Sequence, residues 1–348
     1  MGRMEWLELG AALVVILVGA ETFTNGVEWV GEQHGLSEGA VGSVLAAVGT
    51  ALPETILPLI AIMLGGASNE EFGIGAILGA PFMLTTLAMF VLGVAVLVFS
   101  RGGRRSKELD GEDTVITQDL GYFLSMYTLA VIAGLVHVKL LHYALAVGLV
   151  VGYVLYVRRH FKMPGKGEEE GEAVGEVKPL YLWGWTHGAT KKEAWNKRSS
   201  KWWTYVQVIG ALLLIIGGAR LFVNGVSLLS ERLGIPHIVF GLLLAPIATE
   251  LPEKFNSVLW VRRKKDTLAL GNLTGAMVFQ SSFPVCVGLL LTPWELTDEA
   301  LVAAIVAVAA GSVLYVTMRL RGKFQAWVLL LQGLFYAAFV GYVLTKVT

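Results

Sequence analysis

Leu52-Pro53-Glu54 lies inside an apolar stretch of the chain, and the same three residues return inside another apolar stretch as Leu251-Pro252-Glu253, 199 residues later. We expect a proline inside each of these helices to break the helix, because it removes one backbone hydrogen bond and frees a carbonyl oxygen. A carboxylate at membrane depth is costly, and by default it marks the path of an ion or substrate. Because both features occur together at matching places in two halves of one chain, they indicate the binding site of a transporter.

The composition is that of an integral membrane protein. The chain has 348 residues, of which 55% are hydrophobic and only 16% are charged, and its mean hydropathy is +0.65. A soluble domain of this size carries far more charge. The formal net charge is zero, which gives no support to a nucleic-acid partner. The single Cys286 cannot form an internal disulfide, and no Cys/His cluster suggests zinc.

Ten segments are long and apolar enough to cross a bilayer, which takes about 20 residues per helix. The N-terminal segment has no small-residue cleavage site, so we interpret it as a retained first helix. Five spans lie on each side of a polar stretch at 159–201. The predicted spans are 6–30, 37–64, 71–99, 118–136, 138–158, 202–230, 236–261, 267–292, 298–319 and 323–346.

The loops predict the orientation of these spans in the cell membrane. Basic side chains follow the third, fifth, seventh and ninth spans, whereas the alternate loops are short and acidic or nearly neutral. By the positive-inside rule the basic loops and the 159–201 segment are cytoplasmic, and both termini are outside. The central segment combines an acidic, Gly-rich linker with a Trp-containing basic run that suits the headgroup zone.

An internal repeat explains the doubled motif. Residues 19–54 align without gaps on residues 218–253, and fifteen of the thirty-six positions are identical. Each half has five spans, an odd number, so the second half enters the membrane upside down. We therefore expect an all-α integral membrane protein of ten transmembrane helices, arranged as two inverted five-helix repeats (1–158 and 202–348) joined by the cytoplasmic loop 159–201.

The two repeated segments bring together the oxygen ligands that a hard cation needs. Each half supplies a carbonyl freed by its proline, a threonine hydroxyl and a carboxylate. Calcium takes about 6–8 oxygen ligands, and two carboxylates neutralise a divalent ion. The alternative is a kinked helix whose carboxylate is hydrogen-bonded for packing. The predicted ligands are Gly49, Thr50 and Glu54 in the first half and Ala248, Thr249 and Glu253 in the second.

Two further polar residues break the symmetry of the repeat. Glu250 corresponds to Ala51, and it is either a third carboxylate near the ion, able to bind and release a proton, or a group facing a water-filled vestibule. Gln280 lies at membrane depth in the eighth span and can contribute an amide oxygen. Glu21 and Arg220 occupy matching positions of the first and sixth spans, where an intramembrane ion pair is one interpretation.

These motifs resemble those of the cation/calcium antiporter superfamily, close to the prokaryotic sodium/calcium exchangers. Gly49-Thr50-Ala51-Leu52-Pro53-Glu54 resembles the first family repeat motif G-T-S-L-P-E, and residues 248–253 resemble the second. Gly271-Asn272-Leu273-Thr274-Gly275-Ala276 is similar to the family's G-N-x-x-G-S. The resemblance implies exchange of calcium for sodium by alternating access, with the first and sixth spans sliding across a fixed core and Glu54 and Glu253 as the shared ion ligands.

The sequence also departs from the family pattern. Four positions where the family has serines are different here: Ala51, Glu250, Ala80 and Ala276. The family also has a polar residue at the end of each third-helix motif, and this position holds Leu84 in one half and Gln280 in the other. These positions supply much of the family's sodium coordination, so the counter-ion is open between Na⁺ and H⁺, with Glu250 and the paired glutamates as proton carriers in the second case. We expect no enzyme activity and no cofactor besides the transported ions, and a monomeric transport unit in the lipid bilayer. The alternative from another functional class is a passive cation channel.

Overall fold

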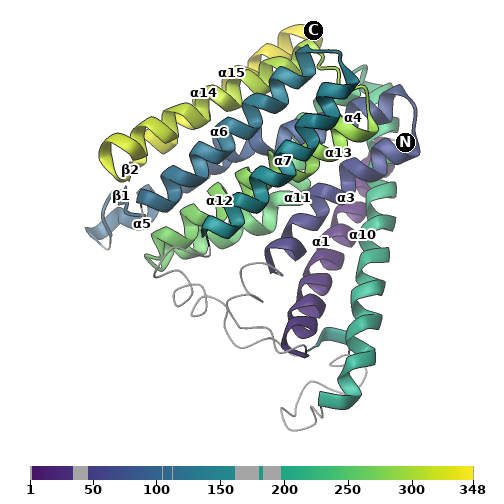
Figure 1. Cartoon of the computed structure of the whole chain (residues 1–348), viewed down its shortest axis with the longest axis horizontal. Helices are drawn as coiled ribbons and strands as arrows, with labels where there is room; N and C mark the ends of the chain where they lie inside the picture. Colours follow the sequence, from purple (N-terminus) through teal and green to yellow (C-terminus); the bar gives the residue numbers. More distant parts are fainter. Residues whose placement is uncertain are drawn as a thin grey trace. The chain divides into compact units, whose positions relative to one another are not determined.

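The structure is a computed structural model of the chain, and it describes residues 2–33, 46–103, 105–111, 113–160, 180–182 and 197–347. These residues are almost entirely helical (Figure 1). The helices of the first half are α1 (Gly2–Gln33), α3 (Ala46–Leu64), α4 (Ala67–Met83), the π-helix η2 (Leu84–Ala88), α5 (Met89–Ser100), the 3₁₀ turn η3 (Arg101–Gly103), α6 (Asp113–Leu135) and α7 (Lys139–His160). Those of the second half are α10 (Lys197–Leu233), α11 (His237–Arg262), α12 (Asp266–Gln280), α13 (Phe283–Leu291), α14 (Asp298–Arg321) and α15 (Ala326–Val347).

The helices follow the apolar segments of the sequence. Within the described residues, eight helices are long and apolar enough to cross a membrane, and two shorter apolar stretches, Ala51–Leu64 and His237–Glu250, lie within α3 and α11. Local signals set the ends. Helix α14 starts where Thr297 Oγ1 accepts from the Ala300 N–H (3.3 Å), and it ends at Gly322, whose φ of 65° suits glycine.

Cα packing divides the chain into two compact units. The first unit contains residues Met1–Ile56 and Phe161–Gly225, and the second contains Leu57–His160 and Val226–Thr348. In the first unit, α1 packs closely on α10 between Val208 and Gly225. A Cβ added at Gly19 would lie 2.8 Å from Ile215 Cγ1, and one added at Gly218 would lie 2.8 Å from Ile16 Cγ1. Small residues therefore let these two helices approach as they do in membrane proteins generally.

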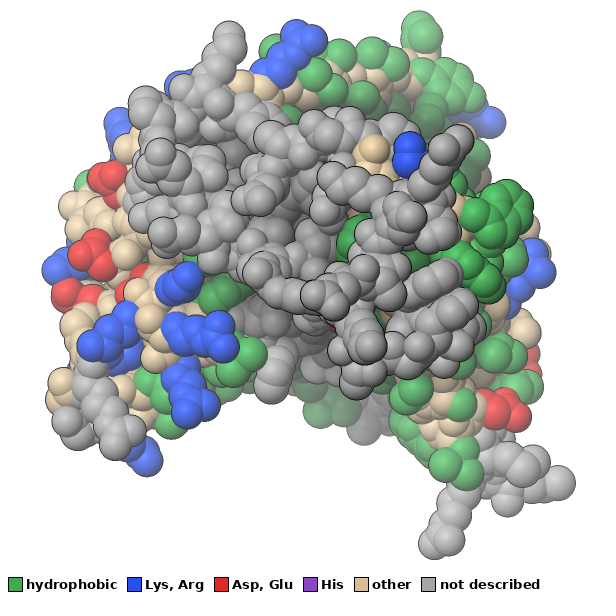
Figure 2. Space-filling model, turned by 90° about the horizontal axis from the view of Figure 1, so that it is seen from below, with side chains coloured by type: hydrophobic (Ala, Val, Ile, Leu, Met, Phe, Trp, Pro, Cys, Tyr) green, Lys and Arg blue, Asp and Glu red, His purple; other side chains and the backbone are tan. Residues whose placement is uncertain are grey.

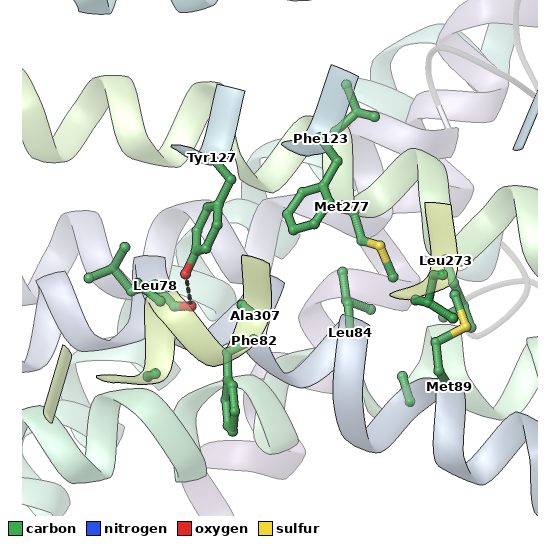
Figure 3. Close-up of a cluster of buried hydrophobic side chains, with 14 of the residues drawn as sticks. Leu78, Phe82, Leu84, Met89, Phe123, Tyr127, Leu273, Met277 and Ala307 are labelled. Carbon is green, nitrogen blue, oxygen red and sulfur yellow. Dashed lines mark hydrogen bonds between the residues drawn. The ribbon is translucent and has the colours of Figure 1, made fainter. Parts of the chain in front are cut away.

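The second unit holds a continuous apolar core. Figure 3 shows Phe82 and Leu84 from the α4–η2 segment beside Phe123 and Tyr127 of α6 and Met277 of α12. The Tyr127 hydroxyl donates to the carbonyl of Leu78 (2.9 Å), so the one polar atom of this fully buried ring is satisfied. Around this core α11 packs on α4, α15 on α5, α12 and α14 on α6, and α13 on α7.

Helices α4 and α11 cross with their backbones close together. A Cβ added at Gly75 would lie 2.5 Å from the Ile238 carbonyl oxygen, and one added at Gly79 would lie 2.5 Å from that of Leu242. A Cβ at Gly241 of α11 would lie 2.4 Å from the Phe72 carbonyl oxygen. Only glycine permits backbones this near. Thus the third span of the first half is fixed against the second span of the second half.

One end of the second unit gathers basic loops. Arg105 Nη2 donates to both carboxylate oxygens of Asp266 (2.7 and 3.0 Å), and its Nη1 donates to the carbonyl of Val261 (2.6 Å). The short antiparallel strands β1 (Glu108–Leu109) and β2 (Phe324–Gln325) join the loops after the third and ninth spans. Three loops predicted to share one side of the membrane are therefore in contact. Charged side chains also gather at the left edge of the face in Figure 2.

The opposite end of α6 carries the loops predicted for the other side. The indole N–H of Trp294 donates to the carbonyl of Ala130 (3.0 Å). The side chain of Leu296 packs against Gly134, in the space that a Cβ on this glycine would need. His137 Nε2 is 3.9 Å from Glu295 Oε1. The separation of basic and non-basic loops in the sequence thus matches two opposite ends of this unit.

Candidate cation site

Glu54 is buried in an apolar helix. It lies on α3 in the part that belongs to the first unit, and only 5% of its surface is exposed. Pro53, next to it, is also buried. Because the proline nitrogen carries no hydrogen, the carbonyl four residues earlier loses its usual partner. A buried carboxylate beside a released carbonyl provides two of the oxygen types that a dehydrated cation uses.

The second unit holds the corresponding segment on α11. Glu250 is completely buried, and Thr249 and Ala248 are 4% and 2% exposed. The Thr249 hydroxyl donates to the carbonyl of Ala245 (3.2 Å), which leaves its oxygen lone pairs available. Ala51, the counterpart of Glu250 in the first repeat, is likewise buried. The carboxyl group that breaks the repeat symmetry is therefore inside the protein rather than at its surface.

The helices are less broken than we predicted. Helix α3 continues through Pro53, and α11 continues through Pro246 and Pro252 without leaving the α conformation. Proline costs about 3 kcal/mol inside a helix, but burial in a packed bundle offsets such a cost. The expectation of broken helices is corrected to continuous helices whose hydrogen-bond ladders are interrupted at these prolines.

Gln280 ends α12 inside the protein. It is 2% exposed, and its Oε1 atom is buried without a hydrogen-bond donor among the described residues. A buried amide oxygen normally has a partner, because an unsatisfied one costs about 1–3 kcal/mol. A cation can supply that missing partner. Gln280 is thus an acceptor available for an ion on the helix that packs against α11.

Four buried hydroxyls were missed by the sequence analysis. Thr85 and Thr86 lie in the π-helix η2, and Ser281 and Ser282 lie in the turn between α12 and α13. All four are fully buried, and each donates to a carbonyl of its own helix. A second, weaker match of the repeat aligns Gly75-x3-Gly79-Ala80 with Gly271-x3-Gly275-Ala276, and the same offset aligns Thr85 with Ser281 and Thr86 with Ser282. Both pairs lie where the helix of a third span is irregular, a feature that is frequent at functional sites and that only the structure shows.

Asp119 is a second buried carboxylate that the sequence analysis did not single out. It is fully buried on α6, where the hydroxyls of Thr274 (2.7 Å, to Oδ2) and Tyr156 (3.1 Å, to Oδ1) donate to it. Thr274 belongs to the motif 271–276, so this contact joins the fourth span to the eighth. The carboxylate stabilises the position of α12.

The structure places a tyrosine against Glu21. The Tyr181 hydroxyl donates to Glu21 Oε1 (2.7 Å), and the ion pair of Glu21 with Arg220 stays a prediction. Asn25 Oδ1 accepts from Gln207 Nε2 (2.9 Å). This bond links α1 to α10 as an interhelical hydrogen bond.

Some predicted ligands lie outside the described residues. Helices α3 and α11 include Gly49, Thr50 and Glu253, but their side chains are not among those described. Within the described residues no group of three or more His, Cys, Asp or Glu side chains stands ready to hold a metal. Glu54 belongs to the first unit and Glu250 to the second. The convergence of the two Leu-Pro-Glu segments on one ion stays a prediction.

Comparison with known proteins assigns the chain to a family. The model of the family described as "Sodium/calcium exchanger protein" matches residues 4–161 and 203–345. The chain belongs to the sodium/calcium exchanger family. The two matched ranges fall on the two halves that carry the repeat, and they leave out most of the central polar segment. This family consists of membrane transporters.

Relatives and solved structures agree with this family. The chain is 22% identical to "Putative antiporter CaxA" of Alkalimonas amylolytica over 338 residues, 95% of this chain and 94% of the relative. It is 28% identical to "Sodium/calcium exchanger MaX1" of Methanosarcina acetivorans over 127 residues, 36% of each. The fold is similar to that of the H⁺/Ca²⁺ exchanger CAX (TM-score 0.75, 17% identity, 97% and 82% covered). It is also similar to the sodium-calcium exchanger NCX_Mj (TM-score 0.57, 20% identity, 98% and 99% covered).

Proposed function

We propose that this exchanger is a secondary-active antiporter of the cell membrane that moves Ca²⁺ against Na⁺ by alternating access. The observation that carries the proposal is the burial of two carboxyl groups, Glu54 and Glu250, on the two helices that bear the repeated Leu-Pro-Glu motif. Buried carboxylates in apolar helices bind cations or protons. The family match supports calcium exchange, and the ion is proposed to lie at the midplane between the two motifs, with Glu54 and Glu253 as shared ligands.

The remaining ligands follow from the same helices. Oxygen atoms of Thr50, Thr249, Gly49 and Ala248 complete the coordination of the ion, and Gln280 adds an amide oxygen from α12. The buried Gln280 Oε1, which lacks a donor among the described residues, supports its part in the shell. We further propose that ten helices form two inverted repeats, with both termini outside and the central segment cytoplasmic.

The division into two units supports the alternating step. Helix α1 and α10 as far as Gly225 belong to one compact unit, while the glycine-packed α4 and α11 belong to the other. Close packing of α1 on α10 lets these two helices move together as a pair. We propose that this pair slides and opens the site to one side of the membrane at a time.

Proton coupling is the second candidate. Glu250 is completely buried where the first repeat has Ala51. A buried carboxyl group that is not neutralised by an ion takes up a proton, because desolvation disfavours its charged form. An H⁺/Ca²⁺ exchange would therefore use Glu250 as the proton carrier.

One transport experiment separates these functions. Purified full-length protein is reconstituted in proteoliposomes, and uptake of radiolabelled calcium is measured with internal sodium, with an imposed pH gradient, and with neither. We expect uptake that requires outward sodium. Uptake driven only by the pH gradient would show that the counter-ion is the proton and not sodium. Equal uptake in all three conditions would contradict the antiporter and support a channel.

Matched variants test the ligands. Truncating one partner of a buried charged contact costs about 2–5 kcal/mol, so Glu54→Gln and Glu253→Gln should each lower calcium uptake by about thirtyfold or more. Glu231→Gln removes an exposed carboxylate from the same half as Glu253 and should leave uptake unchanged. Full calcium exchange by both Glu54→Gln and Glu253→Gln would refute the ligand assignment.

A further inference from the structure

A groove of about 740 Å³ runs along α6 between α7 and α14 in the second unit. Its volume lies in the range of about 300–1,000 Å³ that is usual for ligand sites. All its lining residues belong to this unit, and they include none of the predicted cation ligands. The groove is therefore separate from the proposed transport site.

Charge gathers at one end of this groove. Arg159 near the end of α7 and Arg319 near the end of α14 both line it and are both exposed. Neither arginine forms an ion pair with the described residues. Asp113 lines the same end at the N-terminus of α6, so the side chains at this end of the groove keep one net positive charge. This end attracts an anion.

A buried donor lies in the same groove. Gln118 lines it, and its Nε2 atom is buried with no acceptor among the described residues. An amide N–H without an acceptor costs about 1–3 kcal/mol. This nitrogen is not exposed to the groove, so the Gln118 side chain would have to rotate to donate to a phosphate or ester oxygen there.

The other part of the groove is apolar. Met126 and Leu129 of α6 and Leu145 and Leu149 of α7 line it away from the arginines. Gly148 opens the wall between them, because a Cβ added there would meet nothing within 4 Å. A ligand that fits has a negative head beside the arginines and hydrocarbon chains beside the leucines.

We propose that this groove binds an anionic phospholipid of the cytoplasmic leaflet, with the phosphate between Arg159 and Arg319 and the acyl chains along α6 and α7. The arginines lie at the ends of α7 and α14 that the positive-inside rule places in the cytoplasm, where anionic lipids are enriched. Basic pockets between transmembrane helices on this side bind such headgroups. The proposal concerns binding only, so its outcome is independent of which ion the protein transports.

Native mass spectrometry of the full-length protein in detergent tests this inference. Dissociation constants of the first bound lipid are measured for phosphatidylglycerol and for phosphatidylcholine with the same acyl chains. Each arginine near an anionic headgroup contributes about a fivefold gain in affinity, so Arg159→Gln/Arg319→Gln should weaken phosphatidylglycerol binding about 25-fold and leave phosphatidylcholine binding almost unchanged.

Charge-matched controls decide whether the groove or the surface binds the lipid. Arg158 and Arg321 lie within two residues of the groove arginines, but they do not line the groove. Arg158→Gln/Arg321→Gln removes the same charge and should change phosphatidylglycerol affinity by less than about twofold. An equal loss in both double variants would overturn the proposal in favour of nonspecific surface attraction.

A steric variant tests the acyl-chain part. Gly148→Leu fills the apolar wall without a clash and should weaken the binding of both lipids, whereas Gly341→Leu, which also meets open space but lies on α15, should not. Unchanged lipid affinity in Gly148→Leu would contradict the placement of the chains. Inorganic phosphate is added as a competitor, and displacement of phosphatidylglycerol by millimolar phosphate would show a site for a free anion instead of a lipid.

Discussion

The α4–α11 crossing gives a prediction that the structure makes quantitative. In Gly79→Ala the new Cβ would lie 2.5 Å from the Leu242 carbonyl oxygen and 2.7 Å from its Cα. An ordinary contact begins at 3.4 Å, so the two backbones must separate by about 0.9 Å at this point. Both neighbours are backbone atoms, which cannot rotate away as a side chain does.

The energy follows from this overlap. Overpacking a buried contact costs about 1–3 kcal/mol, and we expect a value near the upper limit because only a helix shift relieves the clash. Gly75→Ala, one turn earlier, forces the same separation against Ile238. The double variant Gly75→Ala/Gly79→Ala should therefore cost less than the sum of the single variants, because one movement of α4 relieves both clashes.

Thermal and denaturant unfolding of the detergent-solubilised protein, followed by tryptophan fluorescence, measures these free energies. Gly341→Ala is the control, since its Cβ meets open space on α15, and loss of a helical glycine should stabilise it by about 0.5–1 kcal/mol. Two results would contradict the close approach of α4 and α11. One is a Gly79→Ala variant as stable as Gly341→Ala, and the other is full additivity of the free-energy changes caused by the two α4 substitutions.

Three further variants test other contacts of the second unit. Asp119→Asn should destabilise the protein by about 1–3 kcal/mol in the same unfolding assay, because it weakens hydrogen bonds from two buried hydroxyls, and an unchanged midpoint would contradict their role. Asp266→Asn leaves the almost buried Arg105 (5% exposed) without its charge partner and should cost about 3 kcal/mol or more, whereas a surface-like loss below about 1 kcal/mol would argue against a buried pair. The exposed Glu108–Lys323 pair should show a pH effect instead: Lys323 lowers the pKa of Glu108 below 4.5, and Glu108 raises the pKa of Lys323 above 10.5. The difference in unfolding free energy between wild type and Glu108→Gln should therefore be constant from about pH 5.5 to 9.5. It should shrink as acid protonates Glu108 or as base deprotonates Lys323. A difference that grows in acid would contradict a stabilising ion pair.

Much of the fold could be predicted because it depends on local composition. Each predicted span from 6–30 to 323–346 overlaps a helix of the structure, and α6, α7 and α14 end within a few residues of the predicted limits, apart from the earlier start of α6 at Asp113. The family of the chain also followed from the repeated motif.

The polar residues of the candidate site were less predictable. Glu250 and Gln280 stood out as polar residues in apolar segments, but Thr85 and Ser281 did not, because a hydroxyl next to apolar residues is common in any helix.

The sequence by itself determined where apolar helices form and where an acidic motif recurs, since each of these depends on a run of neighbouring residues. Only the tertiary structure decided which polar atoms are buried and what they contact. The Tyr181 hydroxyl donates to Glu21, and that of Thr274 donates to Asp119 across 155 positions of sequence. Such contacts depend on how helices cross, and the crossing of α4 and α11 is set by glycines whose effect is steric and appears only when two backbones meet.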